Sequence, residues 1–583
     1  MANKLTTRAL KLLHAWKRLQ VSYYGGKYSI HRLLALDAYS QRASLLRSLV
    51  VCIGTPLPMV ALVFVQESVP LQDPKAGWRA NYGFWIRVVI LSFVITHFST
   101  GQAVYFIDGF TISARQLFVL SATVSIIFTL CTVLIGANLI FPLPFSILAM
   151  TPIYNILHIV LFRVIMGGRC MQLLLERRGQ FIKYMNFLYA QIVMMFLYPV
   201  YEMLFRFAEG SRYQVVVILL LPVIKVLIKN VVLRCTAHVE DITPEAVIFT
   251  VDFFNAIYVA TCMQSASSVL AVLAITITDL SQTLIMLYGL HHRTLGIVPS
   301  LYQTDSAPSK SNNATGMLSS LSSLCRDPDK FGQQVRMNVQ VRSCFPHQLS
   351  AVDSSLLDTL TTLERIDATA VVPFRKISSV VSFDKPSTST PCKFPVICTR
   401  RSNVIHPQPD TSALVNLAIT AGAKDSRRPA EKRNSHLQPL PIHPTVLRES
   451  LEVLFTIECL VVTAYLEAVI PFFYTAYMLV MVHLPSAPYH TEMNGVTREN
   501  VGSTVRPVFV FGLLQAASFW MLVAVVKRNC GMQALYHLAF VLEAQGSMIQ
   551  GKLMIWMVIT LCFRVVHFGV DFTFQFAGLG YQF

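Results

Sequence analysis

The chain has 583 residues, of which 54% are hydrophobic and 14% are charged, and its formal net charge is +17. Soluble proteins carry about 25% charged residues, and here apolar runs of roughly 18 residues or longer recur, each long enough to cross a membrane as a helix. This composition excludes a soluble protein. Lys and Arg lie between apolar runs and in two polar segments, not on one basic face, which excludes a nucleic-acid partner.

Residues 1–47 form a basic segment before the first apolar run. Residues 1–36 contain no acidic side chain. Apolar residues recur there at helical spacing: Leu5, Ala9, Leu12, Trp16 and Leu19. The pattern predicts an amphipathic helix on a membrane surface, attracted by anionic lipid headgroups. A mitochondrial presequence and a calmodulin-type target helix would show the same pattern and remain alternatives. The segment contains no apolar stretch that fits a cleavable signal peptide.

Eight apolar runs in residues 48–290 and three in 451–583 predict membrane-spanning helices. Their approximate bounds are 48–65, 83–106, 116–136, 143–165, 184–207, 213–233, 246–263, 267–290, 451–482, 507–526 and 549–573. We therefore expect an all-α, polytopic membrane protein with about eleven spans, within a range of about nine to twelve. The lipid bilayer is its first expected partner.

Basic residues in the short connections set the expected orientation. Residues 1–47 hold nine Lys or Arg and one acid, and the connection after the fourth span adds four more basic residues. These charges place the N-terminus in the cytoplasm. Alternation of the spans then places residues 291–450 there as well, and we expect a plasma membrane or endomembrane location.

Residues 291–450 are rich in Ser, Thr, Pro and Asn and carry 19 Lys or Arg against 12 Asp or Glu. They show no sustained hydrophobic periodicity, which predicts a mostly disordered loop between the two membrane blocks. Such a loop can recruit cytoplasmic protein partners. A glycan at the Asn313 sequon would show that the predicted orientation is inverted.

Motifs of soluble enzymes are missing from the sequence, including GxGxxG, GxxxxGK[ST], HExxH and GxSxG, as is the potassium-channel filter TVGYG. The twelve cysteines include no CxxC pair, and none has zinc-finger spacing. We therefore expect no enzymatic activity, no cofactor and no bound metal.

Ionisable residues inside the predicted spans are the candidate functional residues, because a charge there costs roughly 3 kcal/mol or more. The sixth span carries Lys225 and Lys229, the seventh carries Asp252 and Asn255, and the eighth carries Asp279. Lys225 lies about 12 Å and Asp252 about 10 Å from the cytoplasmic ends of their helices, at 1.5 Å per residue. This depth predicts an ion pair between them. Lys229 lies nearer the interface, where its ammonium group is expected to reach water.

Arg564, His567 and Asp571 in the last predicted span follow one another at i, i+3 and i+7, which predicts one helical face. With the polar residues of spans six to eight, they suggest the polar cavity of a transporter or channel-like protein. The same residues also suit hydrogen bonding between helices. In that alternative the protein is a receptor or scaffold that recruits partners through 291–450.

Two further acid-containing patterns occur in the predicted spans. Glu202 and Arg206 are four residues apart, which suits a local ion pair. Glu458 and Glu467 are nine residues apart and therefore lie on opposite faces of their helix. These two glutamates can line one pathway only if Pro471 or local bending of the helix rotates the two faces.

Three stretches, at 57–87, 251–264 and 535–545, resemble a family of large multi-spanning proteins predicted from oomycete genomes such as those of Phytophthora-type pathogens. The similarity extends over most of both membrane blocks and fades in 291–450. The resemblance implies a multi-spanning membrane protein, and it transfers no activity, ligand or binding residue to this chain.

Overall fold

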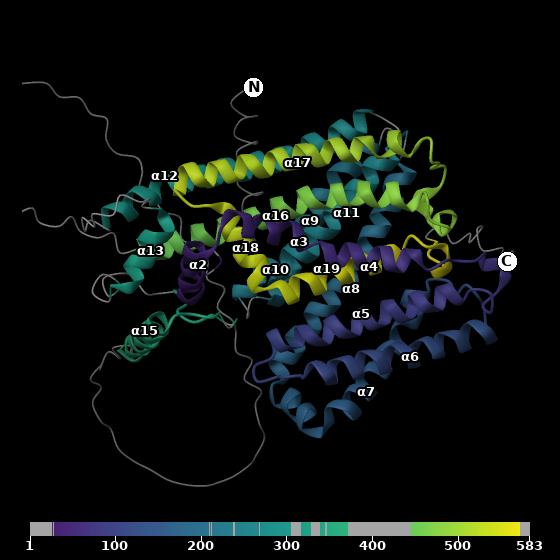
Figure 1. Cartoon of the computed structure of the whole chain (residues 1–583), viewed down its shortest axis with the longest axis horizontal. Coiled ribbons are helices and arrows are strands. Elements are labelled where there is room, and N and C mark those ends of the chain that lie inside the picture. Colours follow the sequence, from purple (N-terminus) through teal and green to yellow (C-terminus); the bar gives the residue numbers. More distant parts are fainter. Residues whose placement is uncertain are drawn as a thin grey trace, which may run out of the picture. The chain divides into compact units, whose positions relative to one another are not determined.

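The computed structural model describes most of the chain and shows helices joined by short connections (Figure 1). The described residues are 26, 28–208, 210–211, 213–236, 240–266, 269–304, 316–327, 331, 339–343, 345, 347–370 and 445–571. No strand occurs among them, so the predicted all-α class is confirmed. The amphipathic pattern from Leu5 to Leu19 lies outside these residues, as does nearly all of a separate unit, Ala368–Pro441.

In the described part of the chain, ten helical segments are long and apolar enough to cross a membrane, within the predicted range. They are α3–α4 (Leu45–Gly54 and Leu57–Ser68), α5 (Tyr82–Phe106), α6 (Ala114–Asn138), α7 (Ser146–Glu176), α8 (Arg178–Phe207), α9 (Gln214–Thr236), α10–α11 (Thr243–Val247 and Phe253–Ser265), α12 (Val269–Thr304), α16 (Val446–Met481) and α17 (Val501–Cys530). The protein is thus a multi-pass integral membrane protein. A π-helical turn, η4 (Ile248–Asp252), joins α10 to α11.

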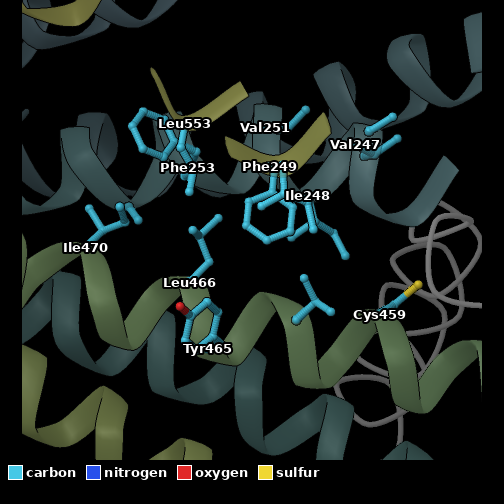
Figure 2. Packing of buried hydrophobic residues seen from close by; sticks show 14 of the residues in the cluster. Val247, Ile248, Phe249, Val251, Phe253, Cys459, Tyr465, Leu466, Ile470 and Leu553 are labelled. Atoms are coloured by element: carbon cyan, nitrogen blue, oxygen red, sulfur yellow. The ribbon is translucent and has the colours of Figure 1, made fainter. Parts of the chain in front are cut away.

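The α10–α11 segment and α16 are the most buried of these helices. Every residue in the most apolar stretch of Thr243–Ser265 is buried, as are 89% of those in the stretch from Val446–Met481. Figure 2 shows apolar side chains of η4, including Ile248 and Phe249, facing Leu466 of α16. A helix that is apolar on all sides and fully buried lies inside a bundle. Polar side chains on these two helices therefore face other helices and not lipid.

The predicted eleventh span, 549–573, is wrong at its C-terminal end. The helix α19 (Gly546–Cys562) stops earlier and is followed by a 3-10 turn, η7 (Val566–Phe568). Val565 pairs with His490 in an isolated bridge, and Gly569 then adopts a left-handed conformation with φ 61°. The chain continues to be apolar after Cys562, but these contacts end the helix.

The end of α19 also corrects the predicted polar face. Arg564, His567 and Asp571 do not share a helical face, because none of them lies in α19. Arg564 precedes η7, His567 lies within it, and Asp571 lies in the irregular segment that follows. The spacing i, i+3, i+7 has this meaning only while the helix continues.

Part of the segment 291–450 is ordered into helices, which corrects the prediction that the loop begins at residue 291. The helix α12 continues to Thr304, and α13 (Met317–Arg326) and α15 (Ala351–Ala370) follow. Backbone amides at the start of α2 (Ile30–Arg42) donate to carbonyl oxygens of this segment, from Ile30 to Gln340 and from His31 to Val341, each at 3.0 Å. Residues 371–444 lie outside the described part.

The helix α2 packs against other helices of the bundle. Ser29 caps its N-terminus by accepting a hydrogen bond from the Arg32 amide, and Leu33, Leu34 and Leu36 are buried. It contacts α13 and α18 (Ala534–Ala544), and α18 in turn contacts α3 (Figure 1). These helices mark one end of the bundle, which we call the α2 end.

Candidate functional site

Asp252 lies at the centre of a buried charge cluster. It ends the π-helical turn η4, a type of turn that is rare and found often at functional sites. Lys225 Nζ lies 3.2 Å from Asp252 Oδ1, and Lys229 Nζ lies 2.8 Å from Oδ2. The predicted Lys225–Asp252 ion pair is confirmed.

The prediction that Lys229 reaches the membrane interface is wrong. Its side chain is buried and its ammonium group binds Asp252. The two lysines are one turn apart and share a face of α9, so they reach the two oxygens of one carboxylate. A buried carboxylate without these partners would cost several kcal/mol, which favours the inward position of Lys229.

The helix α16 supplies the third side of the cluster. Lys225 Nζ donates to Glu467 Oε1 at 2.7 Å, and Thr463 Oγ1 donates to Asp252 Oδ2 at 3.2 Å. Thr463 and Glu467 are four residues apart and therefore share a face. The cluster joins α9, η4 and α16 through charged and polar contacts that are all buried. We call it the Lys225 cluster, and its members are Lys225, Lys229, Asp252, Thr463 and Glu467.

Asp279 lies on α12, beside this cluster, and faces a small cavity. The cavity has a volume of about 20 Å³ and is lined by Asn255, Thr278, Asp279, Gln282 and Tyr201, among others. A volume of roughly 10–15 Å³ is enough for one water molecule with polar partners. Gln515 Nε2 of α17 donates to the Asp279 carboxylate, which makes no ion pair within the described ranges.

The charges of this site do not balance. Asp252, Glu467 and Asp279 supply three carboxylates, whereas Lys225 and Lys229 supply two ammonium groups, which leaves one negative charge in excess. Asp279 is within electrostatic range of Glu467, Lys225 and Asp252. An excess charge in a medium of low dielectric is costly, and a proton on one carboxylate removes it.

A second buried cluster is centred on Arg32 of α2. Arg32 forms ion pairs with Glu245 and with Glu458 Oε1, the latter at 3.0 Å, and its guanidinium also donates to the Asp241 carbonyl. His537 Nε2 lies 2.9 Å from Glu458 Oε2. Glu458 and Glu467 thus serve separate clusters, as their spacing predicts. Arg32 was not among the predicted site residues.

Arg564 and His567 lie apart from the Lys225 cluster, at the other end of the bundle. Arg564 binds Glu492 Oε2 at 3.1 Å and donates to Thr261 Oγ1 at 2.5 Å. His567 Nε2 donates to the Gln72 carbonyl at 2.7 Å. Burial lowers the pKa of His567 to about 4, so the ring is neutral at pH 7. These residues act as separate links between segments.

Glu202 and Arg206 form a local pair, four residues apart on one helix. This is the expected ion pair, at 2.7 Å, on a partly exposed face of α8. Over the described ranges, no group of three or more His, Cys, Asp or Glu side chains has a geometry suited to a metal ion. Comparisons of the chain with protein-family models, with curated proteins and with solved structures find no match.

Proposed function

We propose that the protein is a proton-coupled membrane transporter, with Asp279 as the carboxylate that binds and releases the proton. The observation that carries this proposal is the charge excess beside a cavity of water size. Three carboxylates face two lysines, and Asp279 is the one held only by an amide among the described contacts. If these charged residues formed only structural ion pairs, equal numbers of acids and bases would be enough, and Asp279 would not be needed.

The contacts also suggest how the proton acts on the helices. Glu467 and Asp252 share Lys225, and a negative Asp279 repels both carboxylates. Protonation of Asp279 removes that repulsion and stabilises the observed packing of α9, α11, α12 and α16. Release of the proton favours a second arrangement, and a protein shifts between two states by the difference in free energy that binding supplies.

Reconstituted vesicles test the proposal. The full chain is placed in liposomes that enclose a pH-sensitive dye, and amino acids, sugars and organic acids are added in turn under an imposed pH gradient. We expect at least one solute to drive proton movement that empty liposomes lack. Asp279→Asn should abolish this movement, because an amide does not carry the proton. Glu202→Gln is the matched control and should retain it.

Two results would contradict the proposal. Unchanged proton movement in Asp279→Asn would remove this carboxylate from the transport step. An equal loss in Glu202→Gln would show that any missing acid on a membrane helix disturbs the protein. Size-exclusion profiles of all three proteins establish that the variants are folded.

Other expectations remain predictions. A receptor or scaffold role through 291–450 is the alternative function, and residues 371–444 lie outside the described part. Removing 371–441 from the full chain should abolish partner binding if that alternative holds, and should leave proton coupling unchanged if the transporter proposal holds. The cytoplasmic N-terminus and kinship with oomycete membrane proteins are likewise predictions.

A further inference from the structure

A polar groove of about 500 Å³ lies at the α2 end, where α2, α3 and α18 meet Phe345, His347 and Gln348. Its volume is in the range of pockets that hold small organic ligands, roughly 300–1,000 Å³. Its walls carry the following polar and aromatic side chains: Tyr39, Arg42, Arg47, Phe345, His347, Gln348, Phe540 and Glu543. The groove is separate from the Lys225 cluster and from the cavity beside Asp279.

The groove carries a net positive charge. Arg47 binds Glu543, and Tyr39 donates to the same carboxylate at 2.9 Å, whereas Arg42 makes no ion pair with any described residue. Two guanidinium groups against one carboxylate leave one positive charge. Burial lowers the pKa of His347 to about 3, so this ring adds no charge at pH 7. Guanidinium groups bind phosphate with two parallel hydrogen bonds, and Arg42 is open to do so.

An apolar stripe begins immediately beside these arginines. Leu46, Val50 and Ile53 on α3 are 71%, 61% and 67% exposed and follow one another at i, i+4 and i+7. They share one face of the first membrane-spanning segment, Leu45–Ser68. In a bilayer this face meets lipid chains. Arg47 lies in the same first turn of α3, so the charged groove and the apolar stripe are continuous.

We propose that this groove binds the headgroup of an anionic glycerophospholipid, with its phosphate on Arg42 and Arg47 and its acyl chains along Leu46, Val50 and Ile53. A phospholipid has the same order of parts, an anionic group joined to apolar chains. A free phosphate would use the arginines and leave the stripe unused. The groove is formed jointly by α2, α3, α18 and the three residues Phe345, His347 and Gln348, so the bound headgroup stabilises their docking.

Lipid retention by the full chain tests the proposal. The protein is exchanged into phosphatidylcholine nanodiscs containing a small fraction of phosphatidylserine, and the bound phosphatidylserine is measured by native mass spectrometry after release. We expect Arg42→Gln to weaken retention by about tenfold, the effect of one lost charge-assisted hydrogen-bond pair. Arg42 is exposed and makes no ion pair with a described residue, so the variant should fold normally.

Arg528→Gln is the matched control, because Arg528 is an exposed arginine in the last turn of α17, outside the groove. Its retention of phosphatidylserine should equal that of the wild type. Equal loss in both variants would show general attraction to basic residues and would overturn the proposal. Inositol hexakisphosphate, a soluble phosphate compound, is then added as a competitor. If it displaces phosphatidylserine at an equal concentration, the groove is a phosphate site that does not depend on lipid chains, and the proposal is overturned.

Discussion

Asp252, Lys225 and Glu467 depend on one another more than on any propensity of their helices. Lys225 is within 3.2 Å of Asp252 and 2.7 Å of Glu467, and all three side chains are buried. Removing one partner of a buried ion pair costs about 3–5 kcal/mol of stability, because the other charge remains buried without a partner. The geometry of this site is therefore fixed by charge pairing, and a change in one proton alters several contacts.

His567 gives a residue-scale prediction for pH. Burial is the main cause of its lowered pKa of about 4, and Arg87 and His490 act in the same direction. An unfolded histidine has a pKa of about 6.5, so between these values only the unfolded chain binds the proton. The free energy of unfolding should then fall as pH drops below 6.5, by up to ~1.4 kcal/mol per pH unit.

Thermal unfolding in detergent between pH 7 and pH 4.5 measures this slope. His567→Gln should flatten it, because glutamine keeps a donor for the Gln72 carbonyl and does not titrate. The exposed His291 provides the control, and His291→Gln should leave the slope unchanged. A slope that is identical in wild type and His567→Gln would show that other groups set the acid sensitivity.

The sequence predicts the Lys225–Asp252 pair because helix depth can be counted from the chain. It does not predict Glu467 as a partner, since Glu467 lies 242 residues from Lys225 and hydropathy does not say which helices are neighbours. The predicted position of Lys229 is wrong for a related reason. A lysine near a helix end extends outward only if no buried carboxylate lies within its reach.

At the scale of elements, α2 connects the middle segment to the core. One face of α2 places Arg32 between Glu245 and Glu458, and the helix also contacts α13. Arg326 of α13 binds Asp37 of α2 and Asp353 of α15, each at 3.2 Å. Loss of Arg32 leaves two buried carboxylates without their cation, which should loosen α2 and α13 together.

The labelling rate of Cys325 measures this loosening. Its thiol is buried in α13, and burial raises its pKa to about 12, so it should react slowly with maleimide. We expect Arg32→Gln to speed labelling of Cys325 by about tenfold or more, equal to ~1.4 kcal/mol of lost docking. Mass spectrometry of the labelled peptide assigns the site. Arg448→Gln is the control, because it removes an exposed ion pair on α16 and should not change the labelling rate of Cys325. An equal increase of the rate in Arg448→Gln would refute this role of α2. An unchanged rate in Arg32→Gln would refute it as well.

Helix boundaries show why elements are predicted unevenly. The long spans follow from apolar length alone, and all ten lie where the pattern places them. The end of α19 does not follow from the apolar pattern, because the sequence stays apolar after Cys562. The helix stops there through contacts of Val565 with His490. The helix α13 has apolar residues at helical spacing, but its many serines make the pattern resemble a polar loop.

At the scale of the whole molecule, acids outnumber bases in the two neighbouring charge clusters beside α16. Six carboxylates lie in the two neighbouring clusters, against three fixed cations and one histidine: Asp241, Glu245, Asp252, Asp279, Glu458 and Glu467 against Lys225, Lys229, Arg32 and His537. A purely structural interior would tend toward equal numbers, because each unpaired charge is costly. The excess is the observation on which the proposed proton-carrying function rests.

The protonation state of Asp279 can be read directly by infrared difference spectroscopy of the full chain in lipid at pH 7. A carboxylic acid absorbs at a carbonyl frequency that a carboxylate lacks. We predict that the spectrum of wild type minus Asp279→Asn contains this acid band, and that wild type minus Glu202→Gln does not. Absence of the band from the Asp279→Asn difference would show that Asp279 is ionised and would contradict the proton-coupled account.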